Sequence, residues 1–170
     1  AIPEHIEAIL SSAGGTIRWI ICTHTHPDHS PAWQAVASAT GAQVIGALPA
    51  NDRLQDETFQ PDWEIVHNEV LNTDEFTLRL LHTPGHVSNH FCFLLEEEGM
   101  LFAGDHVMNG STVVIVPPGG DMKAYIESLR LLLAYPIKTI APGHGEVITE
   151  SAQELQGLVE HRLRREAKVV

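Results

Sequence analysis

The 170-residue sequence predicts an α/β fold built as a layered sandwich. Three observations predict it. The first third alternates amphipathic helical segments with short apolar strands, the middle third holds strand-like runs joined by turns, and the last third has two helices around one strand. Length and the 44% of hydrophobic residues suffice for one core, so we expect a single domain over residues 1–170.

The first 60 residues predict alternating helices and strands. Pro3 lies at an early helical position and Gly14 ends the same segment. Ser30 is expected to cap a helix that Pro31 opens, and Pro49 is expected to open another. The predicted elements are a helix over 3–13, a strand over 17–22, a helix over 30–40, a strand over 43–46 and a short helix from 49.

The remaining sequence changes from hairpins to helices. Strand-like runs separated by turn-forming residues, such as EEEG at 96–99, are typical of antiparallel hairpins. Apolar residues then recur at helical spacing from Tyr125 to Leu133. The predicted elements are strands over 64–73, 76–82, 90–95 and 100–103, a helix over 121–134, a strand over 138–141 and a helix from 151.

Composition narrows the function classes. The 22 acidic and 10 basic residues give a net charge of −12, which disfavours binding to duplex nucleic acid or to membrane surfaces. No apolar run approaches the ~20 residues of a membrane span, and the N-terminus does not resemble a signal peptide, so we expect a cytoplasmic protein. Cys22 and Cys92 lie in apolar runs and are expected to be buried free thiols.

The segment THTHPDH carries the strongest chemical signal. His24 and His26 are two residues apart, so on an extended stretch both imidazoles can bind one metal ion. Asp28 and His29 follow a proline-containing bend and can address a second ion. One loop can therefore supply ligands to two metals.

Three later clusters complete a set of seven ligands. His86 in TPGH, Asp105 in GD and His144 in PGHG each follow an apolar strand and have glycine neighbours that permit tight turns. A carboxylate such as Asp105 can bridge two cations, while neutral imidazoles complete the coordination. The isolated residues His5, His67 and His161 are expected to be ordinary surface histidines.

These motifs, in this order and after strands, resemble those of the metallo-β-lactamase superfamily. The segments TPGHVSNH, FAGDHVMNGSTVV, APGHGEVI and HRLRRE are similar to the lactamase-β-like protein 2 branch, which is related to glyoxalase II. The resemblance implies a four-layer αββα sandwich. Because the family's domains begin with strands before the first helix and the branch continues after HRLRRE, it also implies that N-terminal strands and a C-terminal extension are missing.

The resemblance implies how the ligands are shared. His24, His26 and His86 would bind the first metal, His29 and His144 would bind the second together with Asp28, and Asp105 would bridge both. Zinc is the usual metal of the family, with iron or manganese in some relatives. Two such ions lower the pKa of a shared water from about 16 towards ~7, and Asp28 is expected to act as the catalytic residue that orients this water or receives its proton.

We therefore expect a binuclear metal-dependent hydrolase acting on an ester, thioester or phosphodiester, with a small-molecule or short single-stranded RNA substrate. The substrate-binding residues and the oligomeric state are not predicted. Alternatives are a single-strand endoribonuclease, an iron persulfide dioxygenase and a non-catalytic metal-binding fragment. A true β-lactamase is disfavoured because those enzymes generally lack the bridging aspartate. A β-CASP nuclease is disfavoured because only 39 positions separate Asp105 from His144.

Overall fold

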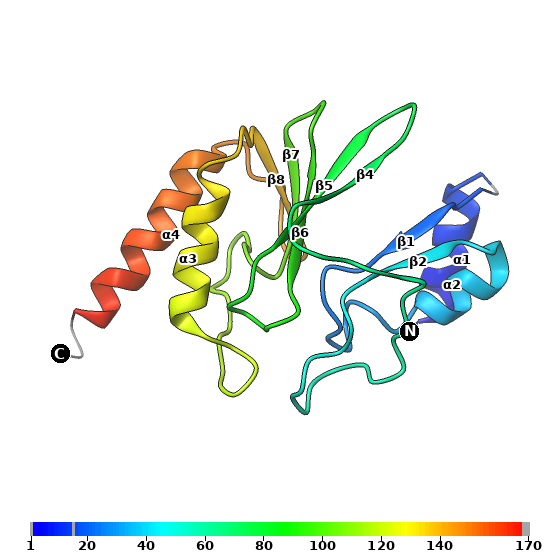
Figure 1. The fold of residues 1–170 in the computed structure, drawn as a ribbon, viewed down its shortest axis with the longest axis horizontal. Helices are drawn as coiled ribbons and strands as arrows, with labels where there is room; N and C mark the ends of the chain where they lie inside the picture. The colour runs from blue at the N-terminus through cyan, green and yellow to red at the C-terminus, as the bar shows by residue number, and fades with distance from the viewer. Residues whose placement is uncertain (1, 15, 168–170) are drawn as a thin grey trace. The chain divides into compact units, whose positions relative to one another are not determined.

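A computed structural model describes residues 2–14 and 16–167. The chain divides into two compact units, Ala1–Ile65 (unit 1) and Val66–Val170 (unit 2). Each unit contains its own sheet with helices beside it (Figure 1). The predicted α/β class is confirmed in both units, whereas the single domain over 1–170 stays a prediction.

Unit 1 is built on a small parallel sheet with strand order β1-β2-β3. Helices α1 and α2 lie next to each other beside it (Figure 1). Cys22, Val44 and Phe59 form its buried core, with the Trp33 ring packed edge-on against Phe59 at 5.8 Å between centroids. The elements are α1 (Pro3–Ser12), β1 (Trp19–Ile21), α2 (Trp33–Thr40), β2 (Gln43–Gly46) and β3 (Trp63–Glu64).

Unit 2 is built on a five-stranded sheet with order β4-β5-β6-β7-β8, antiparallel except for the parallel pair β7-β8. Helices α3 and α4 pack side by side against it (Figure 1). Their apolar residues, such as Leu129 and Leu155, share one buried core with Leu101 and Ile140 of the sheet. The elements are β4 (Glu69–Asn72), β5 (Thr77–His82), β6 (Phe91–Leu95), β7 (Met100–Gly104), α3 (Met122–Leu132), β8 (Thr139–Pro142) and α4 (Ser151–Glu166).

Most predicted elements are confirmed within three residues, including the hairpins of unit 2, and the strand predicted over 17–22 is shortened to β1. Two predictions near α2 are wrong. No helix follows Pro49, where the chain runs through turns. Ser30 does not cap α2, which begins at Trp33 with Ala32 at its N-cap. The Ser30 hydroxyl instead donates to Asp56 at 2.9 Å, so a tertiary contact replaces the local cap.

The strand predicted over 64–73 is also wrong, because it is two strands in different sheets. β3 pairs in parallel with β2 in unit 1, and β4 pairs with β5 in unit 2. Between them Asn68 adopts a positive φ of 66°, and its backbone N–H donates to the carbonyl of Leu80 at 2.7 Å. A left-handed residue interrupts the extended chain, and asparagine tolerates this conformation better than most residues.

The two cysteines are buried and free, as predicted. Burial raises the pKa of Cys22 to about 12, with Asp56 adding to the effect. Burial likewise raises the pKa of Cys92 to about 12, against a smaller opposing effect from Thr83. Because the thiolate is the reactive form, we expect both to react with iodoacetamide at pH 8 at least about 100-fold more slowly in the folded protein than in guanidinium. Mass spectrometry over time measures both rates, and fast alkylation of either folded-state thiol would contradict its burial.

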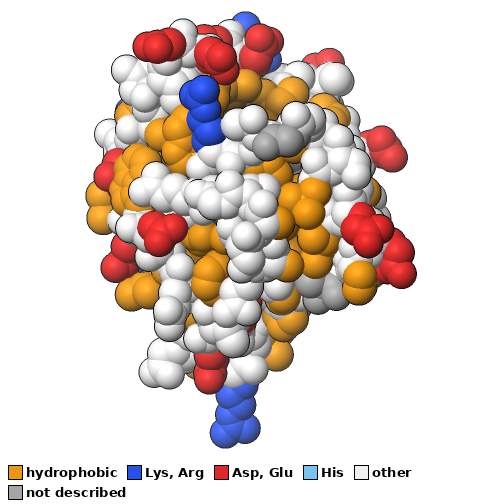
Figure 2. All heavy atoms as spheres, turned by 90° about the vertical axis from the view of Figure 1, so that its right-hand side faces the viewer, with side chains coloured by type: hydrophobic (Ala, Val, Ile, Leu, Met, Phe, Trp, Pro, Cys, Tyr) orange, Lys and Arg blue, Asp and Glu red, His pale blue; other side chains and the backbone are white. Residues whose placement is uncertain are grey.

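Within the described residues, no helix has the length and apolar character needed to cross a membrane. On the face drawn in Figure 2, acidic side chains are spread among hydrophobic ones and the few basic side chains stand apart from one another. This distribution agrees with the net charge of −12 and offers no basic patch on that face.

Candidate metal centre

The loop after β1 brings His24 and His26 together. Nε2 of His24 lies 3.1 Å from Nδ1 of His26, and the ring planes are 80° apart. The other nitrogen of His24, Nδ1, lies 3.0 Å from the Thr23 hydroxyl, which orients the ring. His24 is 1% exposed. Two imidazole nitrogens from different rings therefore converge, as the spacing of the sequence predicts.

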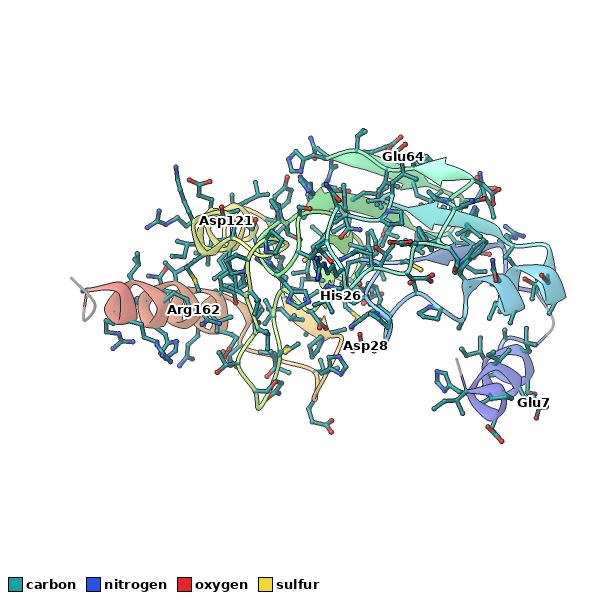
Figure 3. The ribbon with its side chains drawn as sticks, turned by 90° about the horizontal axis from the view of Figure 1, so that it is seen from below. Glu7, His26, Asp28, Glu64, Asp121 and Arg162 are labelled. Carbon is teal, nitrogen blue, oxygen red and sulfur yellow. The ribbon has the colours of Figure 1, made fainter. Side chains whose placement is uncertain are left out.

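A turn after these histidines places Asp28 and His29. The backbone N–H of His29 donates to the carbonyl of His26 at 3.0 Å and closes the turn. His29 lies 4.1 Å from the His24 ring between centroids, and its Nε2 lies 3.6 Å from Oδ2 of Asp28. Figure 3 labels His26 and Asp28 in this loop. All four predicted ligands of unit 1 thus lie in the single loop that follows β1.

A distant segment of unit 1 supports the ligand loop. The backbone N–H of Asp56 donates to the carbonyl of Thr25 at 2.6 Å, while its carboxylate accepts from the Ser30 hydroxyl. Gln55 accepts a hydrogen bond from the Thr25 hydroxyl. The sequence does not predict these supporting residues, since no spacing relates Gln55 and Asp56 to the loop.

In unit 2, each of the two carboxylate oxygens of Asp105 faces the imidazole of a different histidine. Oδ2 is 3.6 Å from Nε2 of His86, and Oδ1 is 3.5 Å from Nε2 of His144. Asp105 directly follows β7, at an irregularity in the β7-β8 pairing, and is 5% exposed. His86 follows β5 and His144 follows β8, so strand ends position all three groups.

These separations suit ligands of a common metal ion. At 3.5 and 3.6 Å the N–O pairs of the unit 2 cluster are longer than strong hydrogen bonds. Two ligand atoms about 2.1 Å from a tetrahedral ion lie roughly 3.4 Å apart. Neutral imidazole nitrogens and a carboxylate are also the donors that zinc and iron bind. The donor set therefore fits a divalent cation, and the two oxygens of Asp105 face two different imidazoles.

The ring of His90 supports the backbone of Asp105. Its Nε2 accepts the backbone N–H of Asp105 at 3.2 Å, so its Nδ1 carries the proton and donates to the Thr83 hydroxyl at 3.0 Å. That hydroxyl donates to Sγ of Cys92 at 3.2 Å, and the thiol faces the carbonyl of Ala103 at 3.5 Å. This buried chain of hydrogen bonds fixes one tautomer of His90, which makes it a support for the aspartate.

His106 is fully buried and packs against the Tyr125 ring, with 4.8 Å between the ring centroids and 55° between the ring planes. Neither of its ring nitrogens has a hydrogen-bond partner in the described chain. Burial, with a smaller contribution from the nearby His86, lowers the pKa of His106 to about 3. The neutral ring is therefore buried beside the core residue Tyr125.

The remaining histidines are structural or exposed. The backbone N–H of His82 donates to Nδ1 of the His67 ring at 3.2 Å, and Nε2 of His82 lies 2.8 Å from the Ser88 carbonyl. His5 and His161 are exposed, as predicted for isolated histidines.

Helix-flanked sheets with histidines and aspartates at their strand ends define an α/β protein with a candidate metal site. The sequence model of the Metallo-beta-lactamase superfamily matches residues 2–144, which is most of the chain. The chain therefore belongs to the metallo-beta-lactamase superfamily.

Two curated relatives match almost the whole chain. The Beta-lactamase-like protein 2 homolog of Caenorhabditis elegans is 29% identical over 172 residues, which cover 99% of this chain and 57% of that protein. An Atrochrysone carboxyl ACP thioesterase of Aspergillus chevalieri is 34% identical over 173 residues, which cover 98% of this chain and 51% of that protein. The chain spans about half the length of these relatives.

A solved structure agrees with the fold. The protein TTHA1623, crystallised in a di-iron-bound form, superposes with a TM-score of 0.72 at 27% identity, covering 90% of this chain and 82% of that one. The expected membership of the superfamily and its fold class are thereby confirmed, and the relatives include both the lactamase-like branch and thioesterases.

Proposed function

We propose that this chain is the catalytic part of a binuclear metal-dependent hydrolase that cleaves a thioester. The observation that carries the proposal is Asp105, whose two oxygens each face one imidazole nitrogen at 3.5 and 3.6 Å. Such a carboxylate suits two cations better than one. A relative named as an ACP thioesterase supports the thioester among ester-like bonds.

The ligand assignment keeps the seven residues of the sequence analysis. Each of the two ions would be held by three residues of its own, and Asp105 would be shared. We assign His24, His26 and His86 to the first ion, and Asp28, His29 and His144 to the second. The converging nitrogens of His24 and His26 support the first set, and the contact between His29 and Asp28 supports the second.

When bound, the divalent ions would lower the pKa of water and polarise the thioester carbonyl. The oxygen of water then adds to the carbonyl carbon, the C–S bond breaks, and the thiolate leaves and takes up a proton. Asp28 is the residue that we expect to receive the proton lost by water, because its side chain is 59% exposed and lies beside His29. The products are a carboxylic acid and a thiol.

Zinc is the metal that we propose, with iron or manganese as the alternatives. The mixed imidazole and carboxylate donors suit all three metals. Because TTHA1623 was crystallised in a di-iron-bound form, iron is retained as an alternative. The charge of −12 disfavours RNA relative to a small thioester, because phosphate binding depends on basic side chains.

The test begins with the 170-residue chain loaded separately with zinc, iron and manganese, and with metal content measured by mass spectrometry. S-Lactoylglutathione, a lactone, single-stranded RNA and a cephalosporin are then assayed with and without chelator. We expect about two metal ions per chain and chelator-sensitive release of thiol from the thioester. Asp105→Ala serves as the inactive control.

The other outcomes contradict the proposal in distinguishable ways. A single iron with sulfite production from a persulfide would assign a dioxygenase. Cleavage of RNA alone would assign an endoribonuclease, and metal binding without any turnover would assign a non-catalytic metal-binding chain.

A further inference from the structure

Arg162 is a buried basic residue that the proposed chemistry does not use. It lies on α4 within the motif HRLRRE (Figure 3), and only 8% of the residue is exposed. Its neighbour Arg164, by contrast, has a side chain that is 72% exposed. Since a buried charge costs free energy unless it is paired or hydrogen-bonded, the contacts of Arg162 need an explanation.

Two contacts hold the guanidinium of Arg162. Its Nη2 donates to the carbonyl of Val113 at 2.8 Å, and its Cζ lies 5.3 Å from the centroid of the buried Tyr125 ring. A planar guanidinium can stack on an aromatic face and donate from its edge at the same time. Arg162 therefore connects α4 and α3 to the segment that carries Val113.

The next carbonyl of that segment contacts a predicted metal ligand. Nδ1 of His86 lies 2.7 Å from the carbonyl oxygen of Val114. A carbonyl only accepts, so Nδ1 carries the proton and Nε2 keeps its lone pair. That Nε2 is the atom 3.6 Å from Asp105. Two consecutive carbonyls are thus held, one by Arg162 and the other by His86.

The side chain of Val113 is buried in the core of unit 2, Ile115 packs against the same core, and Arg162 holds the carbonyl of Val113. Residues 109–120 contain no strand in the described structure. Val114 itself is 60% exposed, so its side chain does not anchor the carbonyl. Core packing thus fixes the side chain of Val113, while the hydrogen bond from Arg162 fixes its carbonyl, next to the carbonyl that His86 uses.

We infer that Arg162 is a positioning residue for His86. By fixing the carbonyl of Val113, it places the carbonyl of Val114, which sets the tautomer and the orientation of the His86 ring. The effect on metal affinity rests on the proposed function, in which His86 is a ligand. The effect on the tautomer does not, because it follows from contacts within unit 2 alone.

The test compares Arg162→Met, Arg162→Lys and the matched control Arg164→Met on the same helix. Zinc affinity is measured by competition with a chelator, and the His86 tautomer is measured in metal-free protein by ¹⁵N NMR, with the signal assigned from a His86→Gln sample. For Arg162→Met we expect zinc affinity to fall 10- to 100-fold, as is usual when a partner of a ligand is lost. The His86 signal should change from the single Nδ1–H tautomer to a mixture.

Arg162→Lys keeps the positive charge and a donor group. We therefore expect its zinc affinity to lie between those of the wild type and Arg162→Met. It should also contain more of the Nδ1–H tautomer of His86 than Arg162→Met does. Arg164→Met should match the wild type in both measurements. The inference is overturned if the folded Lys variant and the Met variant both keep the single tautomer and the wild-type affinity. If the wild type binds no zinc, the proposed function fails, while the tautomer comparison still decides the role of Arg162.

Discussion

Replacement of Asp105 by asparagine is expected to lower metal affinity by more than about 100-fold, because loss of a ligand costs more than the 10- to 100-fold typical of its supporting partners. Asparagine has nearly the same shape but offers one acceptor oxygen and an NH₂ donor in place of two anionic oxygens. It therefore cannot face His86 and His144 as the carboxylate does. Metal titration followed by calorimetry measures the loss, and thioester hydrolysis should fall with it.

A matched control separates this effect from general damage. Asp74 is an exposed aspartate in the turn between β4 and β5, so Asp74→Asn should bind metal like the wild type. Urea unfolding of the metal-free proteins should give similar midpoints for both variants. Full metal binding by folded Asp105→Asn would remove Asp105 from the ligand set and with it the binuclear assignment.

The positions of the candidate ligands follow from local sequence. Each apolar run that becomes β1, β5, β7 or β8 is followed directly by His, Asp and Gly residues, and the structure places these residues at the strand ends. The convergence of His24 and His26 follows from their spacing alone. A short apolar strand and the polar residue that ends it are adjacent in the chain, so one segment of sequence determines both.

The supports of the site could not be predicted in this way. Ser30 has the local signature of a helix cap, yet its hydroxyl binds Asp56, which lies 26 positions away. Arg162 acts on Val113 across 49 positions. The separation of β3 from β4 depends likewise on strand pairing with partners elsewhere in the chain. Contacts of this kind depend on the folded arrangement of each unit, which no short pattern encodes.

The TPGH loop has a second requirement, which is steric. Gly85 has a φ of +145°, and a Cβ at this position would lie 2.4 Å from the Cα of Tyr125 on α3. Around this close approach, the backbone N–H of Asp121 donates to the carbonyl of Gly85 at 2.8 Å, and the hydroxyl of Ser128 donates to the carbonyl of Pro84 at 2.8 Å. The loop that carries His86 is thus docked directly on the backbone of α3.

We expect Gly85→Ala to lower the free energy of unfolding by about 2–6 kcal/mol, since backbone strain and overpacking each cost about 1–3 kcal/mol. Gly157→Ala is the matched control, because Gly157 lies within α4 with no atom near its missing Cβ, and alanine there should raise stability by about 0.5–1 kcal/mol. Urea unfolding of the metal-free variants measures both changes. If Gly85→Ala unfolds like the wild type, the loop can leave α3 without cost and the close approach does not hold His86 in place. Opposite signs for the two substitutions would show that the glycine of TPGH is required by the packing of the loop on α3, independently of any bound metal.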